Sequence, residues 1–98
     1  MRVRISGSAH CDIVDGRRFY DSQELGVGRY FSDTVYSDIR SLENFAEIHP
    51  VRHGYHMMLM RRFPYAIYYE KDSDLVTVVA VLDCRRDPHW ILGKLAGV

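Results

Sequence analysis

Residues 62–90 read RFPYAIYYEKDSDLVTVVAVLDCRRDPHW, and this stretch decides the fold. Side chains alternate in type from Tyr65 to Glu70, and Pro64 stands where a strand can start, because its missing N–H is tolerated there. The polar residues Lys71–Asp74 predict a hairpin turn. Leu75–Asp83 is rich in valine and apolar on both faces, which is typical of a central strand covered on both sides.

A third strand and a short helix are predicted on either side of this hairpin. Tyr55–Arg62 is apolar on both faces at its centre and predicts a strand with Arg61 and Arg62 at its end. Adjacent residues of a strand point to opposite faces, so only one of these arginines is expected to enter a shared site. Pro88 is suited to a first helical turn and predicts a short terminal helix that contains Trp90.

The first half of the chain predicts one strand and two helices. The period-2 alternation of Arg2–Ser6 indicates a short strand, after which Ser8 is a candidate helix cap. Gly26 and Gly28 are expected to form the turn between the helices, and His49-Pro50 ends the second one. The predicted buried stripes are Ala9, Ile13, Gly16, Phe19 and Tyr20 in the first helix, and Phe31, Val35, Ile39, Leu42 and Phe45 or Ala46 in the second.

The order of the predicted elements sets the fold class. A strand is followed by a helical hairpin, then by a three-stranded antiparallel meander and a short C-terminal helix. Helices that precede the strands in a block favour an α+β arrangement over a parallel α/β sheet. We expect residues 1–98 to form a single α+β domain, since the length matches that of one common domain.

Composition narrows the function classes. The 98 residues carry 13 Lys and Arg against 13 Asp and Glu, so a strongly basic nucleic-acid binder is disfavoured. Cys11 and Cys84 lack the spacing of a metal or redox motif and are interpreted as reduced thiols. No signal-peptide or membrane-spanning pattern is visible, so the protein is expected to be cytoplasmic, and neither a metal nor a cofactor is predicted.

Two motifs in combination resemble those of the RelE/ParE superfamily of type II toxins, the plasmid-stabilisation type. They are Arg62-Phe-Pro-Tyr65 and Arg85-Arg-Asp-Pro88, at the spacing found here. The hairpin residues Phe19-Tyr20, Gly26-Val-Gly28, Tyr30-Phe31 and Asp38-Ile-x-x-Leu42 are similar as well. The resemblance covers roughly residues 2–92. It implies a growth-inhibiting toxin that is encoded beside an antitoxin, which binds and neutralises it.

The superfamily contains two mechanisms, and they require different residues. RelE-like members cleave mRNA on the ribosome without a metal, which needs a base, an acid and cations that stabilise the phosphorane. The candidates for these roles are Arg61, Arg62, Arg85, Arg86 and His89, with His53 and His56 as weaker ones that suit a surface role. Arg86 and Asp87 are equally suited to an ion pair that fixes the C-terminal turn.

Charge favours the other mechanism, in which ParE-like members inhibit DNA gyrase. An RNase that docks on ribosomal phosphates relies on Lys and Arg contacts, and this chain has no excess of them. The hypothesis is therefore a ParE-like toxin that binds a protein target such as gyrase. The alternatives are a ribosome-dependent mRNA endonuclease and a partner-binding module that is not toxic. Whether the chain is an enzyme stays open between them.

Antitoxin binding is expected on the second half of the chain. Residues 1–50 carry six Lys and Arg against eight Asp and Glu, whereas residues 51–98 carry seven against five. Antitoxins of this superfamily are usually acidic where they contact the toxin, and sheet edges and helical hairpins are common docking surfaces. The predicted partner-binding residues are Arg61, Arg62, Arg85, Arg86 and Trp90.

Overall fold

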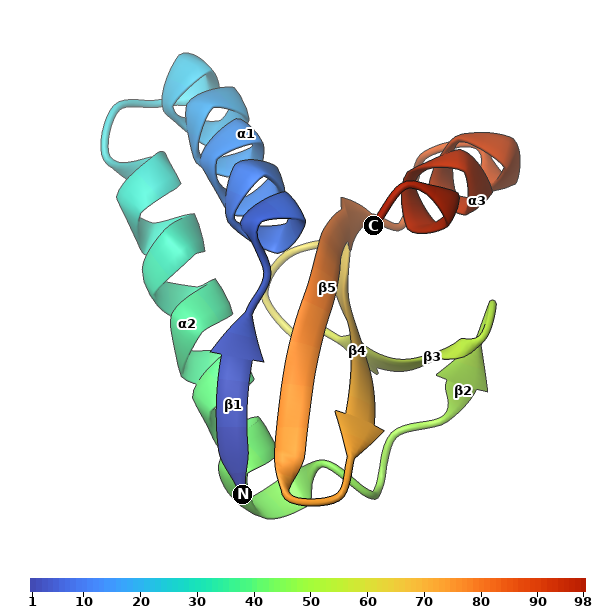
Figure 1. Cartoon of the computed structure of the whole chain (residues 1–98). Helices are drawn as coiled ribbons and strands as arrows, with labels where there is room; N and C mark the ends of the chain where they lie inside the picture. The colour runs from blue at the N-terminus through green and yellow to red at the C-terminus, as the bar shows by residue number, and fades with distance from the viewer.

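The valine-rich strand β5 (Leu75–Asp83) joins the two halves of the sheet in the computed structural model, which describes residues 1–98. It pairs antiparallel with β4 (Tyr65–Asp72) and parallel with β1 (Arg2–Ile5). β3 (Tyr55–Leu59) and the two-residue strand β2 (Val51–Arg52) complete a five-stranded sheet in the order β1-β5-β4-β3-β2 (Figure 1). The expected α+β class and the antiparallel meander are confirmed, and β2 is an addition that was not predicted.

Arg61 and Arg62 do not lie in a strand, and this expectation is wrong. β3 ends at Leu59, after which the Met60 N–H donates to the Tyr65 carbonyl at 2.9 Å and closes a tight connection to β4. Both arginines lie in this connecting loop and are exposed. The expectation that the two arginines point to opposite faces of a strand therefore does not apply.

The helical hairpin consists of α1 (Gly7–Gln23) and α2 (Val27–Phe45). Ser6, and not Ser8, caps α1, because its hydroxyl accepts the Ala9 N–H at 3.1 Å. Gly26 does make the turn, with a φ of 92° that favours glycine. Gly28 instead lies inside α2, where a Cβ atom would collide with the Arg17 carbonyl oxygen and the Asp21 carboxylate. It is a close-packing residue between the two helices.

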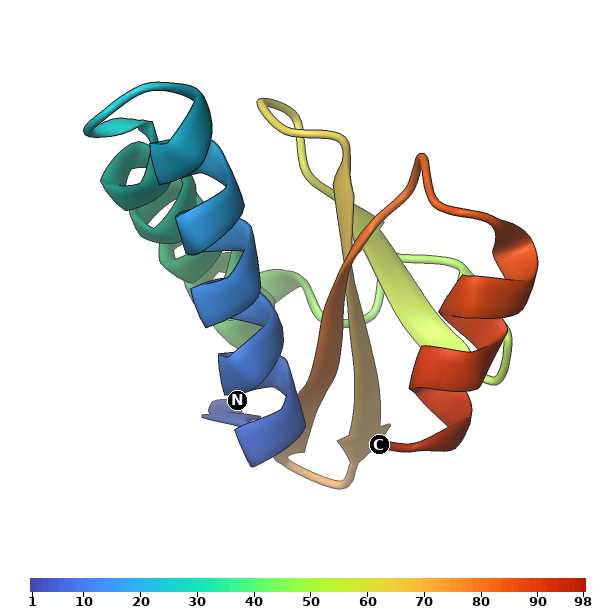
Figure 2. The ribbon, with the colours of Figure 1, turned by 90° about the horizontal axis from the view of Figure 1, so that it is seen from above.

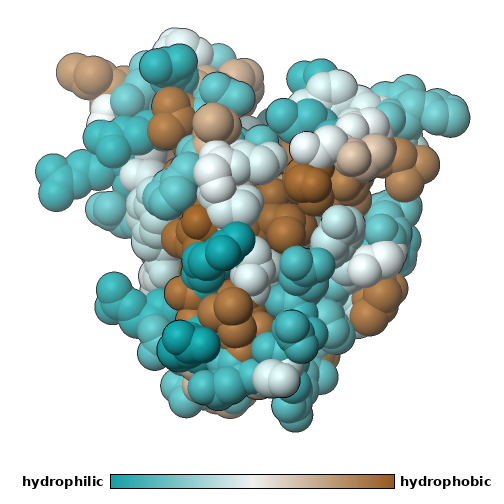
Figure 3. Space-filling view, in the orientation of Figure 1, coloured by the Kyte–Doolittle hydropathy of each residue, from teal (hydrophilic) through white to brown (hydrophobic).

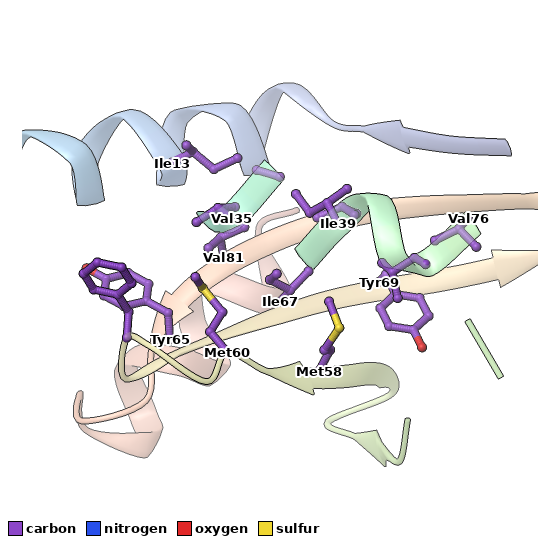
Figure 4. Close-up of a cluster of buried hydrophobic side chains, with 14 of the residues drawn as sticks. Ile13, Val35, Ile39, Met58, Met60, Tyr65, Ile67, Tyr69, Val76 and Val81 are labelled. Carbon is purple, nitrogen blue, oxygen red and sulfur yellow. The ribbon is translucent and has the colours of Figure 1, made fainter. Parts of the chain in front are cut away.

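The main core lies between the hairpin and the sheet, as Figure 4 shows for ten labelled side chains of this layer. The predicted α2 stripe is confirmed, with Ala46 buried at its end while Phe45 is 55% exposed. Phe19 is 45% exposed and does not belong to the buried stripe of α1, which instead includes Asp12. The three tyrosines of β4, Tyr65, Tyr68 and Tyr69, are all buried.

The C-terminal helix α3 (Pro88–Ala96) covers the other face of the sheet (Figure 2). Its Ile91 and Leu95 pack on a smaller apolar cluster that includes Tyr68 and Leu82. Pro88 begins the helix as predicted, and the Asp87 carboxylate caps it by accepting the His89 N–H at 2.7 Å. The sheet is thus the middle of three layers. None of the three helices combines the length and hydropathy that a bilayer-spanning segment needs.

Candidate functional site

A groove of about 890 Å³ runs between α2, the outer edge of the sheet at β3 and the loop that follows β3. The edge is covered only at its start, where β2 pairs with Tyr55 and His56 and the Met57 N–H donates to the Pro50 carbonyl at 2.8 Å, so Met58 and Leu59 have no outer strand. The α2 residues that line the groove lie on the flank of the helix beside its buried stripe, and they are exposed or half-buried. The lining residues are Tyr30, Asp33, Thr34, Ser37, Asp38, Ser41, Phe45, Ile48, His49, Pro50, Met57, Met58, Leu59, Arg61 and Arg62.

Charged side chains occupy one end of this groove. Arg62 donates to the Tyr30 hydroxyl at 3.1 Å and lies 5.8 Å from the centre of its ring. Arg61 makes no hydrogen bond or ion pair within the chain. On the α2 wall, burial raises the pKa of Asp38, although the nearby charges of Arg61 and Arg62 act in the opposite direction. At this end of the groove, the loop wall therefore carries positive charge and the α2 wall carries negative charge.

The opposite end is apolar and unusually exposed. Phe45 and Ile48, at and just after the end of α2, are 55% and 71% exposed, and both line the groove. Large apolar side chains that gather at one place on a surface, with polar groups around them, are typical of a contact site for another molecule. We interpret this end as the apolar part of a protein-docking surface.

Two histidines and a tyrosine support the floor at this apolar end. The Tyr69 hydroxyl donates to the Ala46 carbonyl at 2.6 Å, and Nδ1 of His49 lies 2.9 Å from the same hydroxyl. The His56 ring stacks on Tyr69, and its Nδ1 lies 3.1 Å from the His49 carbonyl oxygen. Burial lowers the pKa of His49, with a smaller effect from His56, and burial raises the pKa of Tyr69 to about 12.

Sequence reasoning missed His49 as a groove residue. The dipeptide His49-Pro50 was interpreted only as the end of a helix, and no local pattern shows that Tyr69, twenty positions away, would lie against it. A surface role was expected for both other histidines: His53 lies exposed in the β2–β3 turn with a φ of 55°, whereas His56 is half-buried in β3 and stacks on Tyr69. Both lie at the start of β3, whereas Arg61 and Arg62 follow its end.

The second pair of predicted site residues, Arg85 and Arg86, lies after the end of β5. Arg85 binds Asp83 through two hydrogen bonds, of 3.0 Å from Nε and 2.8 Å from a terminal nitrogen. These bonds are the main reason why the pKa of Asp83 is lowered. The guanidinium of Arg86 lies 4.0 Å from the centre of the Trp90 ring. The Arg86–Asp87 ion pair, which the sequence allowed as one alternative, does not form, and Asp87 caps α3 instead.

The four arginines predicted as site residues do not line one common cavity. The Cys84 N–H donates to the Pro64 carbonyl at 2.8 Å, so the two arginine loops are neighbours at one end of the sheet. Arg61 and Arg62 line the groove, whereas Arg86 and Trp90 line a separate cleft of about 210 Å³ between α1 and α3. Figure 3 shows hydrophobic surface in the hollow between the hairpin and α3, where this cleft lies.

The arginines of the groove lie far from its histidine, at the opposite end of α2. Arg62 binds Tyr30 near the start of α2, whereas His49 follows the end of that helix. At about 1.5 Å of rise per residue, Tyr30 and Phe45 lie about 22 Å apart along the helix. A general base at His49 and cations at Arg61 and Arg62 would therefore act on different parts of a bound molecule. The geometry suits an extended protein contact better than a single reaction centre.

Comparisons with known proteins give one informative result. No protein-family model matches the chain, and no curated protein does either. Among solved structures, the chain is similar to a chain described as "Chromosomal ParDE TA system from P. aeruginosa", with a TM-score of 0.74 and 12% sequence identity. The match covers 83% of this chain and 92% of the other. The chain therefore has the fold of a protein from the ParDE toxin–antitoxin system.

Proposed function

We propose that this protein is the toxin component of a type II toxin–antitoxin module, which inhibits bacterial growth unless its antitoxin is bound. The observation that carries the proposal is the fold shared with a chain of a ParDE system over 83% of the length. The two arginine motifs that suggested the RelE/ParE superfamily lie at the adjacent loops after β3 and β5. Fold and motif placement thus support the same assignment.

The groove beside α2 is the proposed contact for the antitoxin. Its exposed Phe45 and Ile48 offer apolar contacts to a docked segment at one end. Arg61 and Arg62 attract acidic side chains at the other end of the groove. Arg85, Arg86 and Trp90 extend the basic surface beyond the groove.

The proposed target is a protein, with DNA gyrase as the precedent among ParE-like toxins. Three of the four arginines are already engaged: Arg85 with Asp83, Arg86 with Trp90, and Arg62 with Tyr30. A guanidinium held by a carboxylate has less charge to offer a phosphate. The pairing of Arg85 with Asp83, together with the zero net charge, favours a protein target over the phosphate backbone of RNA.

Ribosome-dependent mRNA cleavage is the second candidate, and one contact favours it. The bond from Cys84 to Pro64 makes neighbours of the two arginine loops, and the exposed His89 lies four residues beyond Arg85. In this reading, His89 transfers a proton while the arginines stabilise the phosphorane. The reading predicts that His89→Ala removes toxicity without unfolding the protein.

One experiment separates these candidates. The chain is induced alone in a bacterial host, and growth, plasmid supercoiling and transcript integrity are followed in parallel. The proposal predicts growth arrest with altered supercoiling and intact transcripts, whereas mRNA cleavage predicts cut transcripts. Unimpaired growth with folded protein present would contradict the toxin assignment and leave a non-toxic binding module. Coexpression of an antitoxin encoded beside the gene should restore growth.

A further inference from the structure

The carboxylate of Asp38 differs from the other buried and half-buried carboxylates of the chain because it has no partner. Four such carboxylates exist, on Asp12, Asp21, Asp38 and Asp83. Asp12 binds Val81 and Lys94, Asp21 accepts the Gly28 N–H, and Asp83 binds Arg85. The carboxylate of Asp38 has neither a hydrogen bond nor an ion pair within the chain. It is the one half-buried anion that the fold leaves unpaired.

The two groove arginines do not supply the missing partner. Arg62 is held by Tyr30, and Arg61 lies on the facing loop without forming an ion pair with Asp38. Their charges reach Asp38 only at longer range, and burial dominates its environment. Burying a charge is costly unless a partner compensates it. The groove between the two walls is where a compensating cation from another molecule fits.

The charges of the groove also restrict what that molecule carries. Asp33 and Asp38 lie on the α2 wall, whereas Arg61 and Arg62 lie on the loop wall. A uniformly acidic segment would be repelled by the α2 wall, and a uniformly basic one by the loop wall. Charge complementarity therefore requires a segment with a basic side chain toward α2 and an acidic one toward the loop.

The distance between Asp38 and Phe45 along α2 sets the spacing of the residues in a bound segment that contact them. Phe45 follows Asp38 by seven residues, which is about 10 Å along the helix axis, or two turns. A helical segment that lies along α2 matches this distance with residues seven positions apart. One of them is then a cation against Asp38, and the other is an apolar side chain against Phe45 and Ile48.

We propose that the groove selects a helical partner segment with a Lys or Arg against Asp38 and an apolar residue seven positions away. Asp38 is thus a specificity-determining residue of this surface, and an acidic residue of the same segment faces Arg61. The inference rests on the proposed function in one respect only, that the natural occupant is the antitoxin. The groove's preference itself is a property of this chain and can be measured with synthetic segments.

The test uses a yeast-displayed library of 21-residue helices on an alanine-rich scaffold, with the positions of one face randomised. The library is sorted separately against the purified full chain, against Asp38→Arg and against Asp72→Asn. Asp72 is an exposed carboxylate at the end of β4 and serves as the control. The chain and the control should enrich Lys or Arg seven positions from an apolar residue, whereas Asp38→Arg should enrich Asp or Glu at that position.

A winning helix should lose roughly tenfold in affinity toward Asp38→Asn, as expected for a hydrogen bond to a charged group, and nothing toward Asp72→Asn. A thermal unfolding curve of Asp38→Asn no lower than that of the natural chain excludes a folding defect. Absence of enriched helices, or the same enriched residues on Asp38→Arg, would overturn the inference. Growth arrest on induction is a separate readout, so the toxin proposal survives or fails independently.

Discussion

The buried carboxylate of Asp12 on α1 accepts the backbone N–H of Val81 in β5 at 3.0 Å. β1 pairs only with residues 75–78 of β5, so the next part of that edge has no neighbouring strand. At this position the Asp12 carboxylate is the hydrogen-bond acceptor that a neighbouring strand would otherwise provide. Its other oxygen lies 3.4 Å from Nζ of Lys94 on α3, so one side chain connects all three layers.

Replacement of Asp12 should therefore destabilise the fold in a graded way. Asp12→Ala leaves the Val81 N–H without an acceptor, at a cost of about 1–3 kcal/mol. Asp12→Asn keeps an acceptor and loses only the attraction to the partly exposed Lys94, which is worth about 1 kcal/mol or less. Urea unfolding of the two variants measures both values, and equal losses would contradict the role of the Val81 bond.

The pH dependence of Asp12 has a predicted sign. Burial raises its pKa above the ordinary value of 3.8, although the Val81 bond and Lys94 act in the opposite direction. The folded state then binds the proton more tightly than the unfolded chain does. As pH falls through the raised pKa toward 3.8, the natural chain should gain stability relative to Asp12→Asn. Urea midpoints of both proteins from pH 7 to pH 4 test this, and parallel curves would refute it.

A matched pair of glycines tests the packing of the hairpin. Gly28→Ala places a Cβ against the Arg17 carbonyl and the Asp21 carboxylate, and such overpacking costs about 1–3 kcal/mol. Gly93 lies in α3 with open space around its Cα. Gly93→Ala should stabilise the protein by about 0.5–1 kcal/mol through helix propensity. Thermal unfolding should thus shift in opposite directions, and a shift in the same direction would argue against the close approach of α1 and α2.

The His49–Tyr69 contact predicts a second pH dependence, with the opposite sign. Burial lowers the pKa of His49 below 6.5, so the unfolded chain binds this proton more tightly. Stability should fall as pH drops from 6.5 toward the lowered pKa. His49→Gln should remove this component, which is visible as a flatter plot of unfolding free energy between pH 8 and pH 5. An unchanged slope would show that His49 titrates normally.

The two arginine pairs should differ in antitoxin binding. Arg61→Glu with Arg62→Glu reverses the charge on one groove wall, and we expect at least a tenfold weaker complex, since about 1.4 kcal/mol corresponds to each factor of ten. Arg85→Glu with Arg86→Glu should weaken it less, because Asp83 already neutralises Arg85. Calorimetric titration with the coexpressed antitoxin measures both, and the reverse ranking would place the contact outside the groove.

The elements of the fold follow from local patterns in the sequence. The α2 stripe, the two apolar faces of β5 and the Pro88 helix start each depend on neighbours within a few residues, and all three were predicted. The misplaced features depend on contacts between distant segments. Gly28 acts through the backbone of α1, and Ser6 caps α1 only because β1 ends one residue earlier than expected.

The candidate site was predictable only in part for the same reason. The arginine motifs marked the loops after β3 and β5, but the tight turn at Met60 moved Arg61 and Arg62 out of a strand and into a groove. The pairing of Arg85 with Asp83 spans two residues, yet nothing in the sequence distinguishes it from an Arg86–Asp87 pair, which the sequence also allows. Asp38 and His49 were noted in the sequence only as part of a motif and as a helix end, and their place in one groove depends on contacts with β3 and the loop after it.

The most direct test of the proposed function is supercoiling of relaxed plasmid by purified DNA gyrase in the presence of the purified chain. We expect inhibition that increases with the concentration of the chain and is relieved by the antitoxin, with no cleavage of mRNA on purified ribosomes. Full gyrase activity at a saturating concentration of folded, growth-arresting protein would contradict it.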